Sequence, residues 1–279
     1  MRSAARKASP RTDEPAGASV SGTKDEGGFT TFLVKLLLAV LLLRIFIVAP
    51  FSIPSESMMP GLLRGDFLLA AKWPYGWSRL SVPFDLPLIP RRINPALPER
   101  GDIAIFQHPL QNADYIKRVI GLPGDTVAMV GGRLILNGQP VARERVGDYL
   151  LPAAPYASCA GAERRITAAG DAVCGYTRYQ ETLPNGRSYA VLDFGRSPQD
   201  DFGPVNVQPG KLFVIGDNRD NSQDSRFPAQ AGGGVGLIDQ EQLVARAGLI
   251  VFSIDGSAQW HNPLTWFTAF RWTRTGERL

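Results

Sequence analysis

The hydrophobic positions of this chain follow two different patterns along its length. A nearly continuous apolar segment, Phe29 to Val48, comes first, and short apolar runs broken by Gly, Pro and Asp follow it. Twenty residues of α-helix span about 30 Å, which matches the hydrocarbon core of a membrane. The segment therefore predicts a transmembrane anchor at 29–48. The polar residues 1–28, rich in Gly, Ser and mixed charge, predict a disordered tail.

Two charges inside the apolar segment leave alternatives open. Lys35 and Arg44 lie near its ends, where long cationic side chains can reach the membrane surface. A cleaved secretory signal is disfavoured because Pro50 follows at once and no good small-x-small site precedes the folded part. A buried helix of a soluble protein is the third option. Basic residues are concentrated before the segment, so the positive-inside rule predicts a cytoplasmic N-terminus.

The rest of the chain is typical of β structure. Gly131-Gly132 and Asn137-Gly138 suit the tight turns of β-hairpins and predict two successive hairpins there. Helix signals are weak beyond a possible turn from Asp239 to Ala245. Short apolar runs bounded by turn residues predict further strands. The expected strands are Phe67 to Ala71, Asp102 to Phe106, Thr126 to Val130, Arg133 to Leu136, Lys211 to Ile215 and Leu249 to Ile254.

Changes in composition divide this β region. We expect a mainly β fold: a main antiparallel-sheet domain formed by 49–140 and 207–258, with an inserted β-rich subdomain at 141–206, preceded by one transmembrane helix. Residues 73–98 are proline-rich and predict an extended ribbon or loop. The end of the chain, 259–279, mixes aromatic and cationic side chains. Such a mixture suits a membrane interface, but it equally suits a cover over one edge of the core.

Composition and charge exclude several classes of protein. A hydrophobic content of 44% in 279 residues is ordinary for a globular protein and implies no multi-span membrane protein. The net charge of +4 is mild and the basic residues are scattered, so we expect no nucleic-acid partner. A monomer is expected.

The cysteines and histidines do not form a zinc-binding pattern. Zinc takes three or four Cys or His ligands, and the only histidines, His108 and His261, show no ligand spacing. A disulfide between Cys159 and Cys174 is favoured if this part of the chain lies in an oxidising compartment. Two unpaired buried thiols remain the alternative.

One serine and one lysine carry the candidate chemistry. Ser57 lies in the run Pro54-Ser-Glu-Ser-Met-Met-Pro60, shortly after the apolar segment, and Lys117 lies in a strand-like run from Asp114 to Ile120. A serine hydroxyl attacks only when a neighbouring base takes its proton. A lysine can be that base where burial disfavours its ammonium form. The pair predicts a hydrolase at a membrane surface.

Four blocks occur in a fixed order behind the anchor. Pro54 to Pro60 with Gly65-Asp66 is followed by Gly101 to Phe106, by Asp114 to Asp125, and by Gly216 to Arg226. Together they resemble the bacterial type I signal peptidases, membrane-bound serine proteases that remove signal peptides from exported preproteins. The resemblance implies that the main domain is catalytic and faces the periplasm, anchored in the inner membrane. Preprotein signal peptides and inner-membrane lipid are the expected partners, and no metal or cofactor is expected.

Carried over position by position, the resemblance implies a role for each matching residue. Ser57 is the nucleophile and Lys117 the general base. The Ser55 hydroxyl and the Ser57 backbone N–H form the oxyanion hole, where one donor contributes roughly 3 kcal/mol. Ser222 orients the lysine amine. The remaining positions are a charge pair that braces the site, Asp224 and Arg226, and residues near small substrate pockets, Phe51, Ile53, Leu62 and Ile116.

The sequence departs from the family pattern in two places. Gly61 stands where threonine is usual, and the segment from Phe227 to Gly236 looks lengthened, which puts the local loop path in doubt. Shallow pockets would admit alanine-sized residues and exclude larger ones by steric clash, so cleavage after A-x-A-like sites is expected.

Three other functions fit the sequence less well. A self-cleaving Ser/Lys repressor protease would lack the transmembrane segment and would carry a DNA-binding helical module. A histidine-based serine hydrolase is disfavoured because neither histidine lies in a triad context. An anchored envelope module that binds peptides without cleaving them is the non-enzyme alternative.

Overall fold

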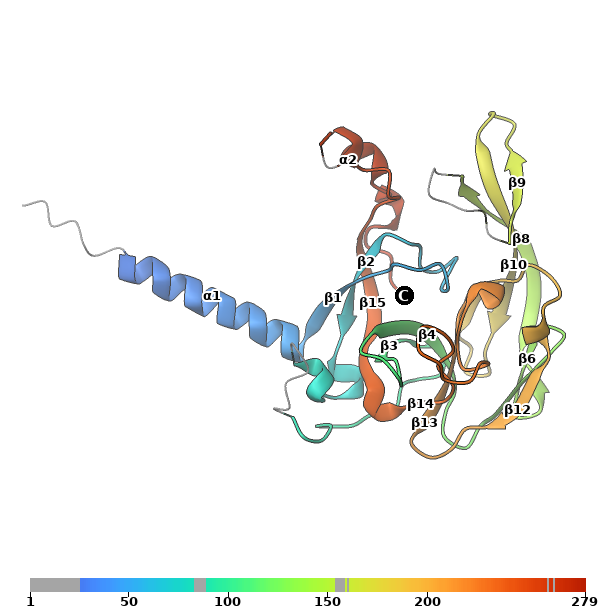
Figure 1. Cartoon of the computed structure of the whole chain (residues 1–279), viewed down its shortest axis with the longest axis horizontal. Coiled ribbons are helices and arrows are strands. Elements are labelled where there is room, and N and C mark those ends of the chain that lie inside the picture. The colour runs from blue at the N-terminus through green and yellow to red at the C-terminus, as the bar shows by residue number, and fades with distance from the viewer. Residues whose placement is uncertain (1–25, 83–88, 154–158, 160, 260, 263) are drawn as a thin grey trace, which may run out of the picture. The chain divides into compact units, whose positions relative to one another are not determined.

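A computed structural model of the chain describes residues 26–82, 89–153, 159, 161–259, 261–262 and 264–279 (Figure 1). Residues 1–25 of the expected tail, part of the 73–98 ribbon, and Trp260 lie outside the described residues. The chain divides into two compact units, 1–41 and 42–279. The unit from 42 onward holds all the strands and the candidate site.

The apolar segment forms helix α1, Glu26–Phe46. Its residues from Gly28 to Phe46 are long and apolar enough to cross a membrane, and their side chains are exposed. A helix of this length and composition fits a transmembrane anchor. The choice between an anchor and a cleaved signal stays a prediction.

A seven-stranded antiparallel sheet forms the main body of the larger unit (Figure 1). Its order is β1-β2-β15-β3-β4-β13-β14. The neighbours β3 and β4 form a hairpin in which Ala104 pairs with Lys117. The strands are β1 (Val48–Ser52), β2 (Asp66–Ala71), β3 (Ile103–Gln107), β4 (Asp114–Gly121), β13 (Lys211–Ile215), β14 (Ile238–Asp239) and β15 (Leu243–Ser253).

Two four-stranded sheets complete the β structure. One has the order β12-β5-β6-β7, and the other has the order β11-β10-β8 with β9 also paired to β10. The first contains the two expected hairpins, and its turn residues have positive φ values of 52° at Asn137 and 77° at Gly138, which suit these tight turns. The strands are β5 (Thr126–Val130), β6 (Arg133–Leu136), β7 (Gln139–Pro140), β8 (Ala142–Pro152), β9 (Glu163–Ile166), β10 (Ala172–Thr182), β11 (Ser188–Leu192) and β12 (Phe202–Asn206).

The mainly β, antiparallel fold class is confirmed, with one local correction. The helical turn expected from Asp239 to Ala245 is confined to Gln240–Gln242, because Leu243 already begins β15 and pairs with Phe106 of β3. Strand β12, at the end of the expected insertion, pairs with β5 of the neighbouring segment. The division into a main domain and an insertion stays a prediction.

The segment after β15 forms short helical elements that the sequence did not predict. They are α2, Leu264–Ala269, and a 3-10 turn, Trp272–Arg274. Trp266, Phe267 and Trp272 are exposed, whereas Phe270 stacks against Phe252 of β15 with ring centroids 6.0 Å apart. The described aromatic side chains thus divide between the core edge and the surface.

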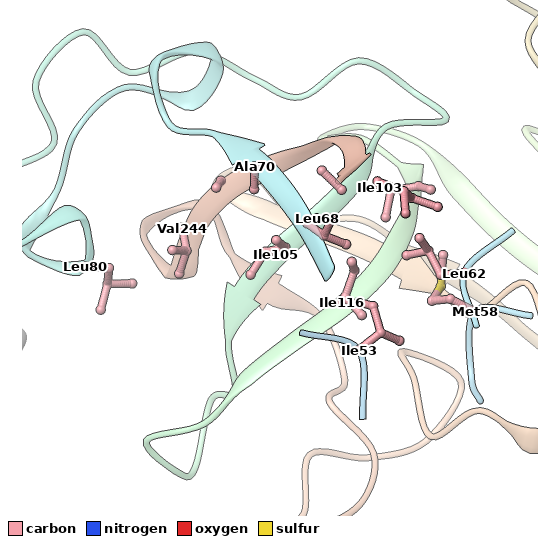
Figure 2. Close-up of a cluster of buried hydrophobic side chains, with 13 residues drawn as sticks. Ile53, Met58, Leu62, Leu68, Ala70, Leu80, Ile103, Ile105, Ile116 and Val244 are labelled. Atoms are coloured by element: carbon pink, nitrogen blue, oxygen red, sulfur yellow. The ribbon is translucent and has the colours of Figure 1, made fainter. Parts of the chain in front are cut away.

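The site is carried by a hydrophobic core under the seven-stranded sheet (Figure 2). Ile53 and Met58, on either side of the nucleophile segment, and Ile116 of β4 belong to the same cluster of buried residues. In Figure 2, Ile53 lies next to Ile116, and Met58 lies beside Leu62. This packing fixes the segment that contains Ser57 against the strand that contains Lys117.

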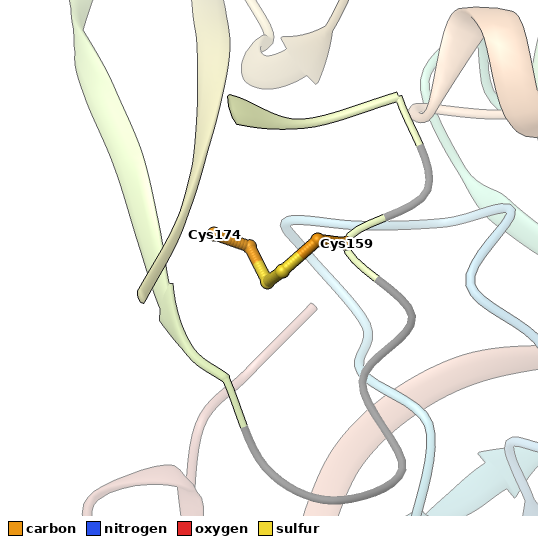
Figure 3. The surroundings of a disulfide bond; sticks show 2 residues. All are labelled: Cys159 and Cys174. Carbon is orange, nitrogen blue, oxygen red and sulfur yellow. A yellow bond between two sulfur atoms is a disulfide. The ribbon is translucent and has the colours of Figure 1, made fainter. Parts of the chain in front are cut away.

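A disulfide joins Cys159 to Cys174 at a sequence separation of 15 residues (Figure 3). Cys174 lies in β10 opposite Leu151 of β8, so the bridge fastens the connection between β8 and β9 to this sheet. The cysteines also pack with Tyr176 and Leu192 in a separate buried cluster.

Candidate active site

Ser57 and Lys117, which are 60 residues apart in sequence, meet in a hydrogen bond of 2.7 Å between Oγ and Nζ. Ser57 lies in the turn after β1, and Lys117 lies in the middle of β4. Both are buried, with exposed fractions of 7% and 4%. The two groups that the sequence singled out are thus in contact in a pocket that excludes most water.

Burial makes the Lys117 amine easier to deprotonate. Its pKa falls from 10.5 to about 8, chiefly through desolvation, and the nearby Arg226 guanidinium acts in the same direction. The carboxylates of Asp224 and Asp217 act in the opposite direction, but desolvation dominates. A substantial share of this amine is therefore neutral near physiological pH.

The hydrogen bonds of Lys117 and Ser222 bear on the group expected to orient the lysine. Besides Ser57, the Lys117 amine donates to the carbonyl oxygen of Ile116 at 3.1 Å. The Ser222 hydroxyl is buried but has no hydrogen-bond partner within the described part of the chain. Within the described residues no hydrogen bond joins Ser222 to Lys117, and the orienting role expected for Ser222 stays a prediction.

The residues expected to form an oxyanion hole lie close to the nucleophile. The Ser55 hydroxyl oxygen is 3.4 Å from Ser57 Oγ, and Ser55 is exposed. Its hydroxyl can therefore turn toward a substrate carbonyl oxygen that becomes negatively charged when Ser57 attacks.

Asp224 and Arg226 form a buried ion pair beside the site. Arg226 Nε lies 2.9 Å from Asp224 Oδ1, and the other carboxylate oxygen accepts from the backbone N–H of Gly216 at 3.0 Å. Arg226 also donates to the carbonyl of Arg219. The ion pair therefore holds the start and the middle of the turn Gly216–Ser222, which packs against the nucleophile.

A cavity of about 420 Å³ opens in front of the Ser57–Lys117 pair. Its walls include three of the expected pocket residues, Phe51, Ile53 and Ile116. The fourth, Leu62, does not line the cavity: it has 0% exposure and points into the core beside Met58 (Figure 2). Because the chain turns after the nucleophile, Leu62 supports the pocket floor without reaching its surface.

A larger groove of about 1130 Å³ lies on the other side of the Ser52–Pro54 segment. It is lined by β8 and the C-terminal segment, and neither Ser57 nor Lys117 belongs to its lining. The larger of these two hollows is therefore not the one that contains the reactive pair.

Sequence reasoning missed a group of buried ion pairs behind the site. Arg118 binds Asp217 through two bonds of 2.7 and 2.6 Å, and its guanidinium lies over the Tyr189 ring. Arg219 binds Glu181 in the same bidentate way. Asp217 and Arg219 belong to the fourth sequence block and could have been found there, but no sequence signal identified Glu181 as a partner.

A second buried lysine shows that burial alone does not make a site. Desolvation also lowers the pKa of Lys72 to about 8. Its amine donates to the carbonyl of Ser81 at 2.7 Å, and a carbonyl cannot act as a nucleophile. The pairing with a hydroxyl distinguishes Lys117.

Comparison with known proteins identifies the family. The family model described as "Signal peptidase, peptidase S26" matches residues 28–252. The chain belongs to this family. It is therefore a peptidase of the class that processes signal peptides.

Similar curated proteins extend over most of the chain. A signal peptidase I from Rickettsia felis is 34% identical over 253 residues, covering 87% of this chain and 85% of its own. A signal peptidase I from Rickettsia canadensis is 36% identical over 223 residues, covering 76% and 75%. A crystal structure of a signal peptidase I from Enterococcus faecalis aligns at 24% identity over 54% of this chain and 97% of its own, with a TM-score of 0.29 too low to support a structural conclusion.

Proposed function

We propose that this signal peptidase family member cleaves the signal peptides of exported preproteins through a Ser57 nucleophile and a neutral Lys117 base. The observation that carries this proposal is the 2.7 Å hydrogen bond between the two side chains in a buried pocket. Family membership supports the reaction class, and the geometry supports the choice of residues.

The chemistry begins with the neutral amine. Lys117 Nζ takes the Ser57 proton as Oγ attacks the carbonyl carbon of the scissile bond. The negative oxygen that develops there accepts hydrogen bonds from the Ser57 backbone N–H and the Ser55 hydroxyl. The lysine ammonium then donates its proton to the leaving amine, which releases the mature chain and leaves an acyl-enzyme. Neutral Lys117 next activates a water molecule, which hydrolyses the ester and restores Ser57.

The cavity supports a preference for small residues before the scissile bond. Phe51, Ile53 and Ile116 form apolar walls of the cavity of about 420 Å³. A bulky side chain would clash with these walls because the core behind them is already filled. Cleavage after small-x-small sequences, such as A-x-A, follows.

The proposed location places enzyme and substrate in one membrane. The helix Gly28–Phe46 would anchor the chain in the bacterial inner membrane with a cytoplasmic N-terminus, as the basic residues before it favour. The catalytic unit would then face the periplasm, where the Cys159–Cys174 disulfide is stable. Sharing the bilayer raises the effective concentration of a membrane-held signal peptide.

The test is cleavage of a preprotein by the detergent-solubilised full chain. The wild-type chain should release a mature protein that begins after an A-x-A site, identified by N-terminal mass spectrometry. Ser57→Ala and Lys117→Met should both abolish cleavage. Lys72→Met is the matched control, because it removes another buried lysine with a lowered pKa and should leave cleavage intact.

Two outcomes would contradict the proposal. An intact preprotein that co-purifies with the wild-type chain would favour the binding-module alternative. Substantial turnover by Ser57→Ala or Lys117→Met would show that other groups perform the chemistry.

A further inference from the structure

A short turn beside the nucleophile connects it to the inserted strands. This turn, Gly216–Ser222, follows β13 and includes a 3-10 helix at Arg219–Asn221. On one side, the Asn218 backbone N–H donates to the Ser57 carbonyl at 3.0 Å. The Asn218 side-chain amide donates to the Glu56 carbonyl, also at 3.0 Å. The backbone on both sides of the Ser57 amide is therefore held by one residue of the turn.

The other side of the same turn is held by β10 and β11. The Leu192 backbone N–H donates to the Asp217 carbonyl at 2.9 Å, and Leu192 forms a parallel bridge with Asn218. Arg219 binds Glu181 of β10 through bonds of 3.0 and 2.5 Å. Glu181 is fully buried and also accepts from the Tyr189 hydroxyl of β11 at 3.0 Å.

Apolar packing joins the nucleophile segment to the same strands. Met58 packs into the core of the seven-stranded sheet, whereas its neighbour Met59 packs with Tyr176 and Leu192 of β10 and β11. The residues that follow Ser57 therefore lie between two separate hydrophobic clusters. Neither cluster alone determines where the Ser57 hydroxyl points.

We infer that β10 and β11 position the nucleophile, and that Glu181 is the positioning residue through which they do so. Glu181 holds the Arg219 guanidinium, Arg219 donates to the Gly216 carbonyl within the turn, and Asn218 of that turn holds Ser57. This inference rests on the proposed function, because it assigns a part in the Ser57 reaction to strands that do not reach the catalytic pocket. Reactive geometry is sensitive to displacements of about 1 Å, so a loosened turn reduces the rate of attack more than substrate binding.

The experiment compares Glu181→Gln with Asp125→Asn in the solubilised full chain. Asp125 is a buried carboxylate that pairs with Arg100 and accepts from the Leu122 N–H, away from the turn, so it reproduces the loss of an ion pair without the link to Ser57. Glu181→Gln should lower kcat by at least about tenfold with KM within about twofold, and Asp125→Asn should change neither. Exchange of the Asn218 amide hydrogen should become faster in Glu181→Gln only.

Every outcome of this comparison decides the inference. A fall in kcat no larger than in Asp125→Asn, or unchanged exchange at Asn218, overturns it. If Glu181→Gln does not fold, Glu181→Gln/Arg219→Gln removes the unpaired buried charge and should show the same loss of kcat. If even the wild-type chain cleaves no preprotein, the proposed function fails, while faster exchange at Asn218 still supports the link and unchanged exchange still refutes it.

Discussion

Acidification should switch off the peptidase, because the proposed base must be neutral to accept the Ser57 proton. Burial places the pKa of Lys117 at about 8, against 10.5 for the same amine in water. This difference corresponds to about 3 kcal/mol in favour of the neutral amine. About half of the amine is neutral at pH 8, and about 1% is neutral at pH 6. The rate should therefore fall about 50-fold between these two values, in proportion to the neutral fraction.

The assay is kcat/KM for a fluorogenic peptide with an A-x-A site, measured from pH 5.5 to pH 9.5 in one detergent. In this plot kcat/KM reports ionisations of the free enzyme. A rate that stays flat from pH 9 to pH 6 would refute the lysine base, provided that circular dichroism shows the protein folded throughout.

A variant tests whether the midpoint belongs to Lys117. The Asp224 carboxylate is the charge that raises the pKa of Lys117 most, so Asp224→Asn should move the midpoint of the acid limb below that of the wild type. Asp125→Asn should leave the midpoint in place, because Asp125 pairs with Arg100 and is not among the charges that shift the pKa of Lys117. A midpoint that rises in Asp224→Asn would contradict the assignment, whatever happens to kcat.

Three further predictions concern stability and specificity. Lys117→Met should be more stable than the wild type at pH 7, by up to about 3 kcal/mol in urea unfolding, because the unfolded chain holds the ammonium that the folded chain disfavours. That advantage should shrink as the pH rises from about 8 to 10.5, and an advantage independent of pH would contradict it. Replacing Cys159 and Cys174 by serine should lower the free energy of unfolding by about 3 kcal/mol, and equal melting temperatures would refute this. Ile116→Ala should admit larger residues before the scissile bond, whereas Leu62→Ala should cost about 2–5 kcal/mol of stability and leave specificity unchanged, as peptide-library cleavage and thermal melts would show.

Local sequence signals were sufficient for the parts of the fold that depend on local geometry. The Gly-Gly pair after Val130 and the Asn-Gly pair after Leu136 adopt positive φ, so the two hairpins could be placed from sequence alone. Ser57 and Lys117 could be paired because each stands in a distinctive block, and the resemblance joined two residues that no local rule connects. Short apolar runs were less informative at their ends, where Leu243 belongs to a strand and not to a helical turn.

The parts that could not be predicted depend on the path of the chain in three dimensions. The direction of the Leu62 side chain depends on how the turn after Ser57 closes, which no local sequence signal specifies. Glu181 meets Arg219 across 38 residues, and a lone glutamate in a polar strand carries no sign of such a partner. Ser222 lies in the expected block, yet its hydroxyl has no hydrogen-bond partner among the described residues, which no sequence signal indicates.

The buried ion pairs behind the site have an electrostatic consequence for turnover. Asp217, Glu181 and Asp224 each face one arginine, so the interior next to the amine holds equal numbers of positive and negative charges. A proton that arrives on Lys117 adds a positive charge to an interior that solvates it poorly, and this desolvation outweighs the attraction of Asp224 and Asp217. In the proposed mechanism the ammonium that forms during attack is therefore more acidic than the ammonium of a solvated lysine. Its acidity drives the proton onward to the departing amine, which lets a lysine serve where many hydrolases rely on an imidazole.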